Sequence, residues 1–511
     1  MTRRQFFYLP NAPIPVRPFV APSISDGKLA EDNESPPVES FSPEAYARPF
    51  CEFMKDNPTT FHAVNAFAEQ LEQRGYQPLS ERALWTLERG GKYYCSRNGS
   101  SLIAFAVGKS YRSGNGIAII AGHVDALTVK LKPVSNLSVK SYGFQQEAVA
   151  PYANGLGSTW WDRDLSIGGR VLVRDPSSGT VQSKLVKLDW PIAKVPTLAE
   201  HFGAPAQGPF NKETQMVPVT GIDNSDLFSS TTTPERSNDG VAIRAGSFAS
   251  TQLPKLVQTI SRQLGITDVN EIVDWELELF DSHPAQLAGL DRDMISAGRL
   301  DDKLCCYAAQ EALLSSPDDA SPGVVKMVGM FDAEEVGSLS RHGANGNFTT
   351  TVLARIVEAF SASYGPSVLS QTLANSFFVS SDVCHAVNPN FTNIYLENHA
   401  LRLNVGVAVW MDPNGHMTTD SVSHAILKRV AQRCGSTLQI FQVRNDSRSG
   451  NTIGPMTSSR TGIRAIDAGI PQLSMHSIRA TTGALDPGLG VKLFKGLFDY
   501  YEEVDKEFLD F

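Results

Sequence analysis

Histidine and acidic residues follow four short apolar segments of the sequence. In open α/β sheets, ligands bind outside the carboxyl ends of the strands. If these four segments are strands of one sheet, their ends bring imidazole and carboxylate groups to a common edge. The segments and the residues that follow them are Ile117–Ala121 with His123 and Asp125, Val324–Phe331 with Glu334 and Glu335, Phe377–Val379 with Asp382, and Leu473–Met475 with His476.

Imidazole nitrogens and carboxylate oxygens, without a thiolate, are a ligand set that binds zinc. A further acid, Asp301, stands at the start of a predicted helix. Two cations a few Å apart need a bridging carboxylate and about two further protein ligands each. One arrangement meets that need with Asp301 as the bridge; the other ligands are His123 and Asp382 for one ion, and Glu335 and His476 for the other.

Two more acids stand beside these ligands. Glu334 precedes Glu335, so one glutamate can be held by a metal while its neighbour takes a proton from the attacking water. Asp125 stands two residues after His123, where its carboxylate can accept the second ring N–H and fix the tautomer. The pattern indicates metal-assisted hydrolysis. A serine hydrolase is disfavoured, because no Gly-x-Ser-x-Gly turn occurs.

Each of these residues also has a purely structural interpretation, and spacing alone does not decide between the two. The alternatives are a hydrogen-bonded core position for His123 and His476, a helix cap for Asp301 and Asp382, and a solvated turn for Glu334 and Glu335.

The elements that position these residues alternate between strand and helix in two parts of the chain. A helical period over 53–71 and another over 303–314 alternate with strand-like segments such as 101–107. This alternation predicts an α/β fold with a mostly parallel sheet flanked by helices. Short β-like runs among Gly, Pro and Ser predict a β-rich insertion between the two parts. The expected domains are a proline-rich arm or leader at 1–42, a first α/β part at 43–126, the insertion at 127–280, and a second α/β part at 281–511.

Composition excludes several classes of protein. The 511 residues are 41% apolar, which suits a globular chain, and the net charge of −9 gives no basis for binding nucleic acid. No apolar run reaches the ~18–20 residues of a membrane span, and four prolines between residues 10 and 18 break any signal-peptide core. Six cysteines without a Cys-x-x-Cys pair exclude a disulfide scaffold and a cysteine zinc finger.

At these motifs the sequence resembles the family of aspartyl aminopeptidases and vacuolar aminopeptidase I, which are co-catalytic zinc exopeptidases. The similarity runs from about residue 45 to the C-terminus, and the stretch 122–135 is most similar to the fungal vacuolar branch. The motifs that carry the resemblance are Ala121-Gly122-His123-Val124-Asp125, Thr159-Trp160-Trp161-Asp162-Arg163-Asp164-Leu165, Phe331-Asp332-Ala333-Glu334-Glu335-Val336-Gly337-Ser338, Ser381-Asp382-Val383-Cys384-His385-Ala386 and Met475-His476-Ser477-Ile478-Arg479.

The resemblance implies a zinc-dependent aminopeptidase that acts on peptides and holds two zinc ions per subunit. It implies the five metal ligands named above and a general base at Glu334. It also implies that His201, in the insertion, reaches into the active site of a neighbouring subunit, and that His385 contacts the substrate. Thr452 and Gly454 resemble residues of the family's substrate loop.

Assembly and location also follow from the resemblance. It implies a dodecamer built from dimers, with the insertion as the dimerisation domain. Residues 1–42 are richer in proline than the amphipathic leader of the vacuolar relatives, so both cytoplasm and vacuole remain as expected locations. The arm is the expected contact for an autophagy receptor.

Substrate preference rests on a departure from the family pattern. Acid-specific members carry a lysine in a short strand after an Asn-His dipeptide, whereas this chain has none in 405–411, after Asn398-His399. We therefore expect release of neutral or apolar N-terminal residues, with an acid-specific aspartyl aminopeptidase as the alternative. A carboxypeptidase or deacylase is a second alternative, for which Arg448, Arg460 or Arg464 would bind the substrate carboxylate. A third, from another class, is a self-assembling autophagic cargo or interaction particle with a secondary catalytic role.

Overall fold

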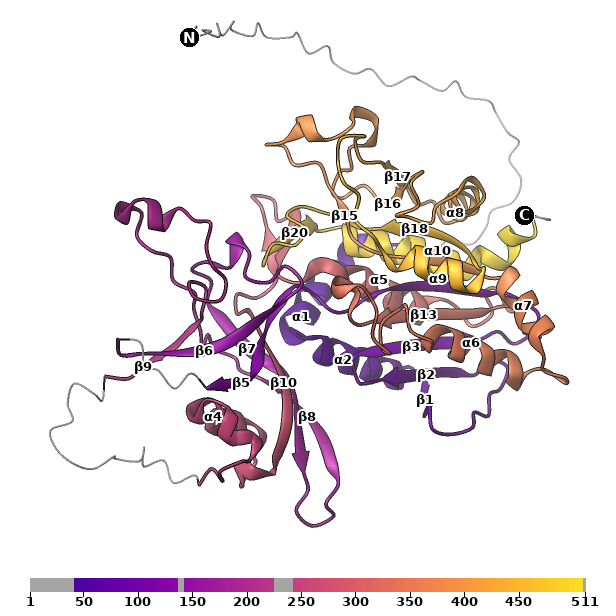
Figure 1. Cartoon of the computed structure of the whole chain (residues 1–511). Coiled ribbons are helices and arrows are strands. Elements are labelled where there is room, and N and C mark those ends of the chain that lie inside the picture. The colour runs from indigo at the N-terminus through magenta and orange to yellow at the C-terminus, as the bar shows by residue number, and fades with distance from the viewer. Residues whose placement is uncertain (1–40, 137–141, 225–241, 509–511) are drawn as a thin grey trace, which may run out of the picture. The chain divides into compact units, whose positions relative to one another are not determined.

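The apolar segments of the sequence form the inner strands of a nine-stranded sheet in the computed structural model of the chain (Figure 1). The structure describes residues 41–136, 142–224 and 242–508. The strands of this sheet are β1 (Gln77–Pro78), β2 (Lys92–Arg97), β3 (Ser101–Val107), β4 (Ile117–His123), β13 (Val325–Phe331), β14 (Phe377–Ser380), β16 (Val407–Trp410), β17 (Leu438–Phe441) and β18 (Arg464–Gly469).

The strand order in this sheet is β1-β2-β3-β13-β4-β14-β18-β16-β17. The four central strands, β13, β4, β14 and β18, run parallel to one another. They are buried along nearly their whole length. Burial on both faces explains why these segments are continuous apolar runs rather than alternating ones.

Helices cover both faces of this sheet. On one face, α6 (Phe348–Ala359) and α9 (Ile453–Thr461) pack into a core that includes Ile119 of β4. Because side chains alternate along a strand, Gly122 faces the other side. A Cβ atom on Gly122 would there meet Asp302 and Cys306 of α5 (Leu300–Ser315), and α5 packs against α10 (Asp486–Asp505). The other helices of this part are α1 (Ala47–Asp56), α2 (Thr60–Gln73), α7 (Pro366–Ala374) and α8 (Ser421–Cys434).

Six antiparallel strands between residues 128 and 281 form a second sheet, in the order β8-β7-β10-β5-β6-β9. α4 (Pro254–Leu264) packs against it, and Leu256 and Ile260 share a core with Ile167 and Leu279. The strands are β5 (Thr128–Asn136), β6 (Phe144–Tyr152), β7 (Leu165–Arg174), β8 (Val181–Lys187), β9 (Val219–Ile222) and β10 (Ile272–Asp281).

The α/β fold with a mostly parallel sheet flanked by helices is confirmed. The domain boundaries stay a prediction, because Ser42–Phe511 form one compact unit. Nearly all of the expected arm at 1–42 lies outside the described residues. Among the residues that are described, no helix is long and apolar enough to cross a membrane.

Two local predictions are wrong. The helical period over 53–71 contains two helices, α1 and α2, because Pro58 lacks an amide hydrogen and restricts Asn57 before it. The segment 473–475 is not a strand: Leu473 makes only an isolated bridge, and the strand β19 (Pro471–Gln472) precedes it.

The smaller sheets are β11 (Gln286–Ala288) with β12 (Met294–Ala297) and β20 (Ala480–Gly483), and β15 (Cys384–His385) with β19.

Arg479 joins the turn that carries His476 to the end of the insertion. Its guanidinium donates to the carboxylate of Asp281 and to backbone oxygens within 283–296. Asp281 is buried and also pairs with Arg163. These bonds join the turn of His476 to the end of β10 and to backbone oxygens on both sides of β11, in the segment that leads into α5.

We expect Arg479→Met to lower the free energy of unfolding by about 2 kcal/mol, because it leaves a buried carboxylate and several carbonyl oxygens with fewer donors. Scanning calorimetry should show a lower Tm. The matched control is Arg429→Met, which removes an exposed ion pair with Glu507 and should leave Tm nearly unchanged. Equal effects of the two substitutions would contradict this role for Arg479.

Candidate functional site

Asp301 lies between the two histidines of the predicted site. Its Oδ1 is 3.1 Å from Nε2 of His123, and its Oδ2 is 3.4 Å from Nε2 of His476. Each histidine has a further acid nearby: Oδ1 of Asp382 is 3.7 Å from the His123 nitrogen, and Oε2 of Glu335 is 3.6 Å from the His476 nitrogen. The structure therefore brings together all five residues that were expected to bind metal.

Separate elements deliver these side chains. His123 ends β4, and Asp382 stands two residues after β14. Asp301 lies at the start of α5 with non-helical angles, φ −76° and ψ 113°, and its two oxygens face the imidazoles of His123 and His476 rather than a backbone N–H of this helix. A helix-cap role for Asp301 is therefore wrong. The side chain of His476 is 44% exposed, in a turn with φ of 62°, so a core position for this residue is also wrong.

The carboxylate of Asp125 holds the backbone of both glutamates. Its Oδ1 accepts the N–H of Glu334 and its Oδ2 accepts the N–H of Glu335, each at 3.1 Å. Oδ2 also accepts the hydroxyl of Tyr152, from β6 of the insertion, at 2.8 Å. Nδ1 of His123 lies 3.1 Å from the backbone oxygen of Asp125 and 3.4 Å from its Oδ1. Asp125 thus lies beside Nδ1 of His123, whereas Asp301 lies beside Nε2. A carboxylate in the position of Asp125 can orient the imidazole of a metal ligand.

Negative charge accumulates in this buried cluster. Burial raises the pKa of Glu335, and the neighbouring Asp301 raises it further. Burial also raises the pKa of Glu334, against the opposing effect of His123. Oε1 of Glu335 and Oδ1 of Asp302 are buried without a hydrogen-bond partner among the described residues. When all these carboxyl groups are ionised, their negative charge exceeds what the imidazoles of His123 and His476 can balance.

The donor atoms suit divalent cations. Ligand atoms of His123, Asp301 and Glu335 lie within 4.8 Å of one another, and so do those of His123, Asp302 and Asp382. Nitrogen and oxygen donors of this kind bind zinc. Cations held here would offset the carboxylate charge and fill the acceptors that have no partner. The residues therefore fit a metal centre.

A cavity of about 480 Å³ opens onto the cluster. All five predicted ligands and Glu334 line it. Its apolar wall includes Trp410 of β16, Met417 and Met475. Within the described part of the chain, no lysine or arginine lines this cavity.

The other predicted site residues lie in different places. His385 and Thr452 line the cavity, and the ring of His385 packs edge-on against that of Trp410, with centroids 5.7 Å apart. Gly454 is buried in the first turn of α9 and donates its N–H to the hydroxyl of Thr452. His201 is exposed on a turn of the insertion and stacks on Phe202. It does not line the cavity of its own chain.

The sequence matches a known family of peptidases over most of its length. The family model of the aminopeptidase I zinc metalloproteases, M18, matches residues 53–498. The chain belongs to the M18 family. It is a zinc-dependent aminopeptidase, as the resemblance predicted.

Relatives of this M18 chain include a vacuolar aminopeptidase and an aspartyl aminopeptidase. Vacuolar aminopeptidase 1 of Saccharomyces cerevisiae is 42% identical over 474 residues, which cover 91% of this chain and 90% of that protein. The aspartyl aminopeptidase of Aspergillus oryzae is 37% identical over 482 residues, which cover 89% of this chain and 96% of that protein.

Solved structures share the fold along nearly the whole chain. Chaetomium thermophilum mApe1 is 53% identical, with a TM-score of 0.84 and coverage of 91% of this chain and 100% of that one. A chain of the Saccharomyces cerevisiae mApe1 dodecamer is 38% identical, with a TM-score of 0.79 and coverage of 92% and 99%. A chain of the complex of Ape4 and Nbr1 is 35% identical, with a TM-score of 0.85 and coverage of 92% and 88%.

Sequence reasoning missed three polar residues of this M18 site. Asp302 accepts the backbone N–H of His123 at 3.3 Å, and its place beside Asp301 was the available signal. Tyr152 reaches the site from the insertion, and no local pattern marks it. Asp467 lies within β18 after its apolar start, and an apolar run before a polar residue is the signal that identified His123 at the end of β4.

Asp467 holds the segment that borders the cavity. Its Oδ1 accepts the hydroxyl of Thr452, and its Oδ2 accepts the N–H of Thr418, each at 2.6 Å. A Cβ atom on Gly454 would lie 2.7 Å from both carboxylate oxygens, so this close approach requires glycine. Burial raises the pKa of Asp467 to about 6, although hydrogen bonds from Ser380 and Thr452 oppose the rise. The place of Thr452 at the cavity therefore depends on this carboxylate.

We expect Asp467→Asn to lower kcat/KM about tenfold, because the amide leaves one buried donor without an acceptor, at a cost of about 1–3 kcal/mol. Steady-state kinetics would measure the fall, and metal analysis should find the zinc content unchanged. Asp446→Asn, on an exposed loop where Asp446 pairs with Arg444, is the matched control and should retain activity. Loss of zinc from Asp467→Asn would instead place this residue in the metal centre.

Proposed function

We propose that this M18 aminopeptidase holds two zinc ions per chain and releases neutral or apolar N-terminal residues from peptides. The observation that carries the proposal is the position of Asp301, with one oxygen directed to His123 and the other to His476. A carboxylate so placed suits a bridge between two ions. His123 and Asp382 would complete one site, and Glu335 and His476 the other. The two imidazoles favour zinc over magnesium.

Glu334 is the proposed general base. Zinc, when bound, supplies Lewis acidity that polarises the scissile carbonyl and lowers the pKa of water. The Glu334 carboxylate lines the cavity, with Oε2 3.8 Å from Nε2 of His123. It accepts a proton from the attacking water and delivers it to the leaving nitrogen as the C–N bond breaks. Asp125 holds the backbone of Glu334, and His385, which lines the cavity, is the proposed substrate contact.

We expect Glu334→Gln to lower kcat at least ~10²-fold while both zinc ions are retained, because the amide keeps the shape but cannot take the proton. Metal analysis of the parent at neutral pH should find near two ions per chain. The matched control is Glu335→Gln, which should lose zinc. An active preparation with one ion or none would refute the two-ion proposal, and loss of zinc from Glu334→Gln alone would reverse the two roles.

The composition of the cavity supports an apolar preference. Val383, Trp410, Met417 and Met456 line it, and no basic residue other than histidine does so among the described residues. An acidic N-terminal side chain would enter this space without a lysine or arginine to pair with. Of the histidines, His385 is the one outside the proposed ligand set, and burial lowers its pKa. Its neutral form therefore predominates near pH 7.

We expect leucine and methionine p-nitroanilides to be cleaved with kcat/KM roughly 10–150-fold above the aspartyl and glutamyl compounds, the range for one missing charge-assisted contact. N-acetylated versions should be inert, because an aminopeptidase needs the free amine. A clear preference for aspartyl or glutamyl substrates would establish the acid-specific alternative, with His385 as the first source of counter-charge to examine.

Little in the structure supports the carboxypeptidase or deacylase alternative. Such an enzyme needs a basic group for the substrate carboxylate. Arg448 and Arg460 do not line the cavity, and Arg464 is engaged by Asp505 and Tyr501. The M18 membership also supports an aminopeptidase.

Assembly is the second part of the proposal. A relative of 38% identity forms a dodecamer. We extend this assembly to the present chain, as a dodecamer built from dimers in which the insertion makes the dimer contacts. His201 lies beside the exposed Phe202, and neither residue lines the cavity of its own chain. That position suits a histidine that completes the site of a neighbour by stabilising the developing oxyanion.

We expect Glu334→Gln and His201→Ala, each inactive alone, to regain activity when dissociated, mixed and reassembled. A working site needs an intact base from one chain and an intact histidine from its neighbour, so random mixing should restore about a quarter of the parent activity. Peptidase assays after native mass spectrometry would measure it. Verified mixing without recovery would place His201 in its own subunit's site or outside catalysis.

Location and receptor binding complete the proposal. One relative is named for the vacuole, and another occurs in a complex with Nbr1. By extension, this chain resides in the vacuole or cytoplasm, and its N-terminal arm binds an autophagy receptor. Assembly as cargo then accompanies catalysis rather than replacing it.

A further inference from the structure

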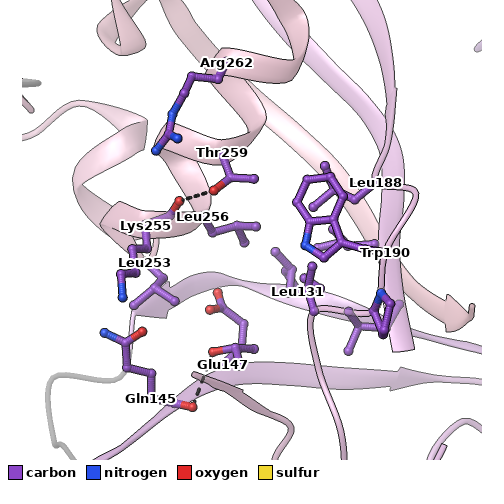
Figure 2. A pocket seen from close by; sticks show the side chains of 15 residues that line it. Leu131, Gln145, Glu147, Leu188, Trp190, Leu253, Lys255, Leu256, Thr259 and Arg262 are labelled. Atoms are coloured by element: carbon purple, nitrogen blue, oxygen red, sulfur yellow. Dashed lines mark hydrogen bonds between the residues drawn. The ribbon is translucent and has the colours of Figure 1, made fainter. Parts of the chain in front are cut away.

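A second cavity, of about 380 Å³, lies in the insertion between the six-stranded sheet and α4 (Figure 2). Its walls are largely apolar and include Leu131, Leu188, Leu256 and the half-exposed Trp190. Small-molecule sites have this volume and composition, with a few polar groups that fix orientation. No residue lines both this cavity and the one at the metal cluster. It is a separate candidate site.

A buried carboxyl group faces this cavity. Glu147 of β6 is 2% exposed, and Figure 2 shows its carboxyl group directed toward Leu256 of α4. Its Oε1 accepts the hydroxyl of Ser135, whereas its buried Oε2 has no partner among the described residues. Burial raises the pKa of Glu147 to about 7, and the hydrogen bond from Ser135 opposes the rise. When Glu147 is ionised, a buried oxygen without a donor is unfavourable, and an N–H group of a ligand would satisfy it.

Two basic residues of α4 also line the cavity. Lys255 and Arg262 are exposed, and neither forms an ion pair with any residue that the structure describes. They are seven residues apart, with Thr259 between them, so all three lie on one face of the helix. The cavity therefore has apolar walls, an acceptor inside and two cations at its exposed side, none of the three paired with a residue that the structure describes.

We propose that this cavity binds a short apolar peptide with a free C-terminal carboxylate. Its apolar side chains would pack against the leucines, an N–H group would donate to Oε2 of Glu147, and its carboxylate would pair with Arg262 and Lys255. A fatty acid would match the walls and the cations but has no N–H group for Glu147. A ligand with only positive charge would meet the two cations at the entrance.

Binding of trileucine to the zinc-loaded Glu334→Gln protein tests this site, because that variant lacks the proposed base and should spare the peptide. Calorimetry should find two peptide sites per chain. Arg262→Glu, added to this protein, should weaken one of them about tenfold, the effect of losing about 1.4 kcal/mol. Trileucine amide should bind that site about tenfold less tightly than trileucine before the substitution, and trileucine should lose this advantage after it.

The matched control is Arg174→Glu, an exposed charge reversal on β7 outside the cavity, which should change neither site. A trileucine with a photoreactive diazirine should label residues 253–262, which separates this site from the catalytic one whatever the substrate preference proves to be. Absence of labelling there overturns the proposal. The proposal is also overturned if trileucine keeps its tenfold advantage over trileucine amide in Arg262→Glu. Displacement of the peptide by decanoate would overturn it too.

Discussion

Negative charge collected in a buried place is the constraint on which this structure depends. Asp301, Asp382, Glu334 and Glu335 face one cavity, with histidines as the only titratable cations among its described lining. Carboxylates removed from water are unfavourable unless positive charge and donors balance them. The fold therefore holds an electrostatic imbalance that bound cations would relieve. Metal binding then contributes to the stability of the folded chain as well as to its chemistry.

One carboxylate couples the insertion to this cluster. Asp125 precedes the insertion in the chain, accepts the backbone N–H groups of Glu334 and Glu335, and accepts the hydroxyl of Tyr152 from β6. The same strand carries Glu147, five residues earlier, into the second cavity. The insertion is thus part of the support for the candidate active site, because removing it would take away one of the two donors to Oδ2 of Asp125.

The sequence alone indicated much of the fold and most of the cluster. His123 and Asp382 follow buried parallel strands, whose continuous apolar runs are easy to recognise. His476 was found through its neighbours although 473–475 is not a strand, because the position depends on a turn with positive φ that periodicity does not reveal. Tyr152 was not found, since its contact with Asp125 depends on the pairing of β5 with β6, which places Tyr152 opposite Thr128, and local spacing does not reveal that register.

The order of strands in the nine-stranded sheet has a consequence for synthesis of the chain. β4 lies between β13 and β14, and both are made about 200 residues or more after it. At roughly 5–20 residues per second, its two edges wait on the order of 10–50 s for their partners. The insertion completes its own sheet at Asp281, before β13 leaves the ribosome. An apolar strand with open edges is an aggregation hazard, so the nascent chain needs protection during this interval.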